Sequence, residues 1–218
     1  MSLFAVFGLA CLTVFLYFSD RKVEISSTSV RDGQPPVLEF VKGFFYAVPC
    51  VILVVILRRY IPISYRGFPL YARFLCTDHL LPAVFLGGLY FLAYTQKGFP
   101  RLLLFGGGFY TLLGIVEILT HYGQYEPYHL LLLPAVRMGG LMFLTIFFLR
   151  YQEWYGMVRV LFLVLLVCTP FLSGVITYLY MRSYLPWAAV LAALFFLGSL
   201  VYTYLERRTP LPRRAPSS

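Results

Sequence analysis

Seven long apolar stretches divide this chain, and they leave few ways for it to fold. About 20 helical residues cross the hydrocarbon core of a bilayer. A helix also satisfies its own backbone N–H and C=O groups inside lipid, where no water can do so. We therefore predict an all-α polytopic membrane protein with about seven transmembrane helices. The predicted spans are 2–18, 41–60, 79–95, 101–121, 129–149, 158–181 and 185–205.

The composition favours the same class. Hydrophobic residues make up 60% of the chain and charged residues 12%, whereas soluble domains carry about 25% charged residues. The net charge of +9 comes from cations in short loops and the carboxyl-terminal tail, where they set membrane orientation. The lipid bilayer is thus the predicted partner, and a nucleic-acid partner is not predicted.

We expect residues 1–205 to form a single transmembrane domain, followed by a basic, Pro-rich tail at 206–218 that is disordered. No Lys or Arg precedes the first apolar stretch. This pattern favours an uncleaved first span over a signal peptide. The four cysteines lack metal-site or CxxC spacing, and we interpret them as small buried hydrophobes.

The basic residues predict how the chain sits in the membrane. With the amino terminus outside, twelve Lys and Arg residues flank the spans on the inner side and five on the outer side. This asymmetry predicts a multi-pass protein of the cell membrane, plasma or bacterial inner, with a cytoplasmic carboxyl terminus. The segment 58–73 is the exception, because it puts four arginines outside. We expect it to lie along the membrane interface.

One apolar phrase occurs twice: LLPAVFLGGLYFL at 80–92 and LLPAVRMGGLMFL at 132–144, identical at ten of thirteen positions. A weaker third copy, LPWAAVLAALFFL, occupies 185–197. Each copy opens a predicted span, and one span lies between successive copies. The pattern predicts a solitary first span followed by three two-helix repeats. The paired small residues predict close helix packing, including faces that other membrane subunits could use.

Two charged residues, Glu117 and Arg137, fall inside predicted spans, where charges are rare and default to functional hypotheses. Both are expected in the outer half, on neighbouring antiparallel helices. Both also depart from the repeat, because Arg137 aligns with Phe85 and Glu117 aligns with Thr177. The alternatives are a structural salt bridge, an anionic solute or lipid group bound at Arg137, and proton movement through Glu117.

The histidines are predicted to gather on the outer side, at the ends of spans. Such a set could relay protons or hold a divalent metal. No HExxH or paired-cysteine spacing supports a particular metal, and no cofactor is predicted. The candidate solute- or proton-site residues are Glu117, Arg137, His121, His129, Asp78 and His79.

Internal repeats around a polar site are common in transporters. The sequence therefore favours a small permease-like transporter, or a subunit of a transport complex, with its polar site at Arg137 and Glu117. Two alternatives stay open: a membrane-embedded enzyme acting on a lipid or peptide, and a non-catalytic scaffold subunit. The chain carries no GxSxG nucleophile motif, which favours a non-enzymatic role.

Overall fold

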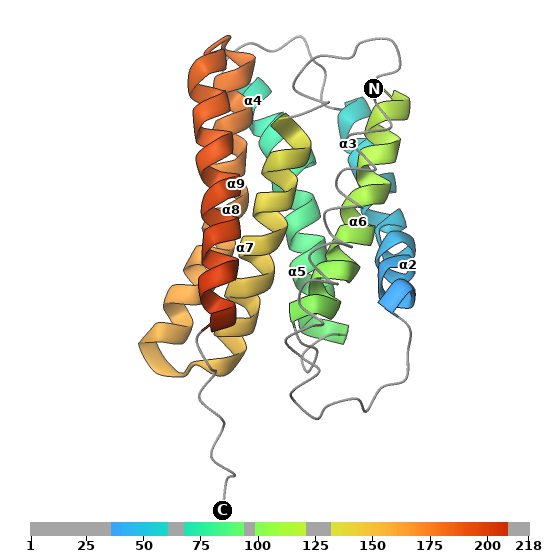
Figure 1. Ribbon diagram of the computed structural model, residues 1–218. Helices are drawn as coiled ribbons and strands as arrows, with labels where there is room; N and C mark the ends of the chain where they lie inside the picture. The colour runs from blue at the N-terminus through green and yellow to red at the C-terminus, as the bar shows by residue number, and fades with distance from the viewer. Residues whose placement is uncertain (1–35, 61–67, 94–98, 121–131, 209–218) are drawn as a thin grey trace, which may run out of the picture.

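The computed structural model of the protein describes residues 36–60, 68–93, 99–120 and 132–208, and the secondary structure in these ranges is helical (Figure 1). The first predicted span, 2–18, lies outside them. The elements are α2 (Pro36–Tyr46), α3 (Val48–Tyr60), α4 (Phe68–Phe74), the π-helical turn η1 (Leu75–Leu80), α5 (Leu81–Ala93), α6 (Phe99–Thr120), α7 (Leu133–Glu153), α8 (Gly156–Met181) and α9 (Leu185–Arg208).

Five helical segments in the described ranges are long and apolar enough to cross a membrane. They are Val37–Tyr60, Tyr71–Leu92, Leu133–Glu153, Gly156–Met181 and Leu185–Leu205. The helix α6 is 22 residues long but is not among these five. The helical class is confirmed, and the count of seven spans and the repeat stay predictions.

The first of these segments is interrupted at Ala47, between α2 and α3. Pro49 causes the interruption, because it has no N–H to donate to the carbonyl one turn earlier and its ring crowds that carbonyl. The chain stays helical around the break: the Ala47 N–H donates to the Gly43 carbonyl at 3.1 Å and the Val51 N–H to the Ala47 carbonyl at 2.9 Å.

The second segment, made of α4, η1 and α5, begins earlier than predicted. The predicted span begins at 79, whereas the helix already begins at Phe68 and its apolar, membrane-length part at Tyr71. Two buried charges, Arg73 and Asp78, lower the hydropathy of this stretch, so the sequence resembles a loop. Asp78 and His79 therefore lie inside the helix and not at its interfacial end. They belong to η1, and such π-helical turns are rare and concentrate at functional sites.

Two further predictions also need correction. The helix α9 continues to Arg208, so the predicted tail starts three residues too early. Among the cysteines, Cys50 is buried as expected, but Cys168 is exposed on the surface of the bundle. A free thiol behaves as a small hydrophobe, so the lipid-facing side of a membrane helix suits Cys168 as well as a core does.

The helix α7 is the centre of the bundle. It packs against α8 and α9 on one side and against α6 on the other, while α2 lies along α6 (Figure 1). Its apolar window is 72% buried, against at most 44% for the other four segments. The turn η1 contacts α8. The polar side chains Arg137 and Thr145 of α7 are therefore held inside protein and away from lipid.

Two glycines permit the contact between α2 and α6. A Cβ atom at Gly43 would overlap the carbonyl oxygen of Phe105, and one at Gly108 would overlap the carbonyl oxygen of Phe40. Only glycine allows the two backbones to approach so closely, as small residues do in membrane helix pairs. Large side chains from α5, α6 and α7, including Tyr90, then fill the adjacent core.

Candidate functional site

Four charged side chains from four elements form a buried chain of ion pairs. Arg58 Nη2 of α3 donates to Asp78 Oδ1 of η1 at 2.7 Å and to Glu117 Oε1 of α6 at 2.8 Å. The other carboxylate oxygen of Glu117 lies 2.6 Å from Arg137 Nη2 of α7. The side chains of Asp78, Glu117 and Arg137 are 1%, 6% and 5% exposed, and that of Arg58 is 17% exposed. We call these four residues the charge network.

The helix directions bring these side chains to one end of the bundle. Arg58 and Glu117 lie near the last residues of α3 and α6, and Arg137 lies one turn after the start of α7. At about 1.5 Å per residue, each is within roughly 6 Å of its helix end. The end of α3, the start of α4, the end of α6 and the start of α7 lie on the same side of the molecule (Figure 1).

Burial makes this arrangement costly unless every charge is paired. Removing an ion from water costs several kcal/mol even after the protein relaxes, and the mutual attraction of the ions must offset that cost. Glu117 does so by binding two arginines, one through each oxygen. Arg58 likewise serves two carboxylates. The network is consequently one interdependent unit and not three separate salt bridges.

Two residues next to Asp78 extend the network. Arg73 Nη2 donates to the Arg58 carbonyl at 3.4 Å, and the side chain of Arg73 is buried. Thr77 Oγ1 lies 2.7 Å from Asp78 Oδ1 and 3.0 Å from the Arg73 carbonyl, and its single proton can serve one of them at a time. Arg73 Nη1 and Asp78 Oδ2 have no hydrogen-bond partner within the described ranges.

His79 points to a different helix from its neighbour Asp78. Its Nε2 lies 2.6 Å from Thr177 Oγ1 on α8. Along the same face of α8, three hydroxyl side chains each donate to the carbonyl four residues earlier: those of Thr169, Ser173 and Thr177. This is how hydroxyl side chains are satisfied in membrane helices. It gives α8 one polar, buried face opposite His79 and Arg137.

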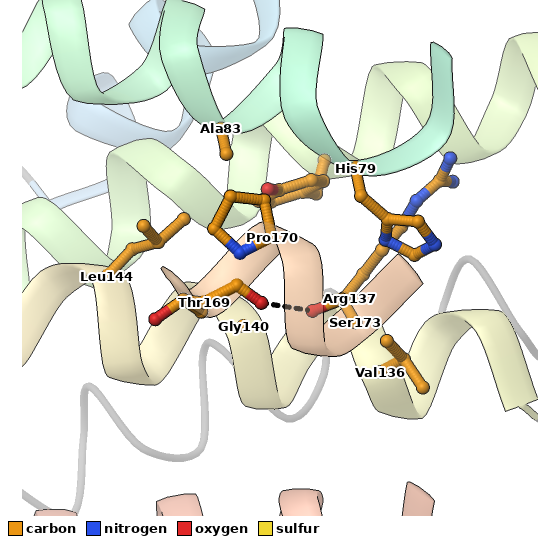
Figure 2. A pocket seen from close by; sticks show the side chains of 10 residues that line it. His79, Ala83, Val136, Arg137, Gly140, Leu144, Thr169, Pro170 and Ser173 are labelled. Carbon is orange, nitrogen blue, oxygen red and sulfur yellow. Dashed lines mark hydrogen bonds between the residues drawn. The ribbon is translucent and has the colours of Figure 1, made fainter. Parts of the chain in front are cut away.

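A small cavity is lined by this polar face of α8, by α7 residues that include Arg137, and by His79 (Figure 2). Its volume is about 10 Å³, which is room for about one water molecule. Sites for drug-sized ligands need roughly 300 Å³ or more. The lining residues are His79, Ala83, Tyr110, Val136, Arg137, Gly140, Leu144, Thr169, Pro170 and Ser173.

The six residues proposed from the sequence divide into two groups. Glu117 and Arg137 form the direct ion pair that their spacing suggested. Asp78 joins them through Arg58, and His79 lines the same cavity as Arg137. His121 and His129 lie outside the described residues.

The metal hypothesis gains no support from the described part of the chain, where no group of three or more His, Cys, Asp or Glu side chains could hold an ion. Sequence reasoning missed Arg58, which it placed in the segment 58–73 expected to lie along the membrane interface. Arg58 falls inside the predicted span 41–60 but only two residues from its end, where an arginine is far less unusual than at Arg137.

Apolar helices long enough to cross a bilayer, packed around buried charges, define a helical membrane protein. No family model matches this chain, and neither a curated protein nor a solved structure matches it. The class therefore rests on the helices themselves.

Proposed function

We propose that the protein is a small permease-like transporter, or the membrane subunit of a transport complex, whose polar site is the charge network and the adjacent cavity. The observation that carries this proposal is the convergence of four buried charges from α3, η1, α6 and α7. Charged side chains within membrane helices are costly, and they typically mark the paths of ions, protons or solutes.

The irregular backbone around the site supports a conformational change in the helices that line it. The turn η1 interrupts the regular α-helical ladder at Asp78 and His79, and Pro170 lies inside α8 directly at the cavity. Irregular turns of both kinds are where helices bend or shift. A solute larger than the cavity needs such a shift to enter.

We further propose that the protein lies in the cell membrane with its amino terminus outside and its carboxyl terminus in the cytoplasm. The excess of basic residues on the predicted inner side supports this orientation. It puts the charge network in the outer half of the bilayer. A reporter fused after Ser218 that reads as external would contradict the orientation.

A second candidate, a scaffold subunit, is favoured by one observation. Each carboxylate of the charge network binds Arg58, as expected of a structural salt-bridge network that only holds the helices together. No described atom would lie within 4 Å of a Cβ atom added at Gly88. The helix surface around Gly88 would then be where another membrane subunit packs. A membrane-embedded enzyme is the third and least supported class.

Ion flux in liposomes separates these candidates. The purified protein is reconstituted, and the release of chloride and the movement of protons are followed with an electrode and a pH-sensitive dye. We expect flux well above that of protein-free liposomes, and at least roughly tenfold less with Arg137→Ala, a loss of more than about 1.4 kcal/mol in transition-state stabilisation. Glu117 keeps Arg58 in this variant, so the protein should still fold.

The matched control is Arg159→Ala, because Arg159 is exposed on α8 and contacts only the Tyr151 ring and hydroxyl in the interactions described. It should leave flux unchanged. Equal flux for Arg137→Ala and the unaltered protein would contradict the placement of the site. Wild-type liposomes that move neither ion would favour the scaffold.

A further inference from the structure

We propose that the cavity beside Arg137 binds a small monatomic anion, such as a halide. As a binding site this stands by itself. The extension, that the anion is the transported species, rests on the proposed function. Three observations carry the inference: the size of the cavity, the balance of charge around it, and the donors that line it.

Size limits the occupant first. The cavity of about 10 Å³ accommodates roughly one water molecule. A monatomic anion fits such a space, whereas a sugar, an amino acid or a lipid headgroup does not. The apolar part of the lining, which includes Val136 and Leu144, also lacks the further polar groups that a larger solute would require.

Charge then decides between an anion and a proton or cation. The described side chains at this end of the bundle include three arginines and two carboxylates: Arg73 and Arg137 are buried, Arg58 is 17% exposed, and both Asp78 and Glu117 are buried. In a medium of low dielectric constant an uncompensated positive charge acts strongly over several ångströms. It attracts an anion into the cavity and opposes the entry of a proton or a metal cation.

The polar groups around the cavity are suited to an anion as well. Arg137 carries a fork of N–H donors and no acceptor, and the Tyr110 phenol can donate a hydrogen bond. Hydrogen bonds from a charged guanidinium to an anion are roughly twice as strong as neutral ones. Neither Asp78 nor Glu117 is among the lining residues, so no carboxylate of the described ranges faces the occupant directly.

The repeated phrase supplies a substitution that reduces the cavity and a matched control for it. A Cβ atom added at Gly140 would meet Ser173 Oγ at 3.6 Å, an ordinary contact. Gly140→Ala therefore fits without strain but takes up space inside the cavity. Gly88 occupies the same place in the other copy of the phrase, and no described atom lies within 4 Å of a Cβ atom there. Gly88→Ala is the matched control.

Thermal unfolding of the full-length protein in detergent tests the binding site. Sodium chloride is titrated against equal concentrations of sodium gluconate, whose anion is too large for the cavity. We expect a saturable rise in Tm with chloride only, by roughly 5 °C at a hundredfold excess over the dissociation constant. Gly140→Ala should abolish this rise and Gly88→Ala should retain it.

A second variant keeps the test decisive if Gly140→Ala unfolds. Tyr110→Phe removes one donor hydroxyl and keeps the ring, so it should raise the chloride dissociation constant several-fold. Identical curves in chloride and gluconate would overturn the inference, as would a wild-type response in both variants. Chloride stabilisation without ion flux in liposomes defeats the proposed function and leaves the anion site. Proton flux through the protein without chloride stabilisation defeats the anion site and leaves the proposed function.

Discussion

The two copies of the apolar phrase lie in different surroundings, although ten of their thirteen residues are the same. The copy in α5 has Phe85, which packs against the core as a partly buried hydrophobic side chain. The copy in α7 has Arg137 at that position, buried and paired with Glu117. Helix formation is common to both, since α5 and α7 begin at equivalent leucines. The neighbouring helices are what differ.

The glycine pairs show the same contrast. A Cβ atom at Gly139 would lie 2.9 Å from Phe195 Cδ1, so α9 packs directly on this residue. The close-packing prediction is confirmed there. At Gly87 and Gly88 no described atom comes within 4 Å, so the prediction fails for the described neighbours of α5. One sequence motif thus serves packing in α7, whereas in α5 no atom of the described ranges packs against the positions that Cβ atoms would take at its glycines.

The largest loss of stability should come from replacing Arg58. This arginine lies outside the repeated phrase but binds both carboxylates of the charge network. Arg58→Ala leaves Asp78 without its arginine and takes one of two from Glu117. Removing one partner of a buried ion pair costs about 3–5 kcal/mol, which we expect as a loss in the free energy of unfolding measured in detergent. The neighbouring Arg59 is exposed, and Arg59→Ala should cost less than about 0.5 kcal/mol. Similar costs for the two variants would refute the network.

A smaller effect should follow when the α7 phrase is made to match the α5 phrase. Arg137→Phe removes one of the two arginines of Glu117, and Glu117→Gln removes the charge itself. If the pair contributes to stability, the double variant should be less destabilised than the sum of the single variants, with a coupling of about 0.5–3 kcal/mol. Unfolding measurements on all four proteins give this coupling. Strict additivity would mean that the 2.6 Å contact contributes no stability.

The smallest effect distinguishes the glycines. Gly139→Ala forces the Phe195 ring to move, and overpacking of this kind costs about 1–3 kcal/mol. Gly87→Ala meets no described atom and should be neutral or stabilising by up to about 1 kcal/mol, because alanine is the better helix former. Thermal unfolding of the two variants side by side is sufficient. A larger loss at Gly87 would show that an undescribed part of the chain packs there.

The residues of the site were predictable to different degrees. Glu117 and Arg137 could be found because each interrupts an apolar stretch, and a charge in such a stretch is rare. His79 and Asp78 could be listed but not correctly placed, because the charges of Arg73 and Asp78 made the start of the second helical segment resemble a loop. Arg58 escaped because arginine at the end of a span is ordinary, and only its two partners, 20 and 59 residues away, make it central.

The sequence by itself determined the class of this protein, because apolar stretches of this length can satisfy their backbone in lipid only as helices. It also determined where α9 begins, since Pro186 of the repeated phrase lies in its first turn, where proline is tolerated. Which glycine is packed, which arginine binds which carboxylate, and where a cavity remains were decided only by the tertiary structure. Those properties depend on side chains brought together from distant segments, and no local pattern of residues records them.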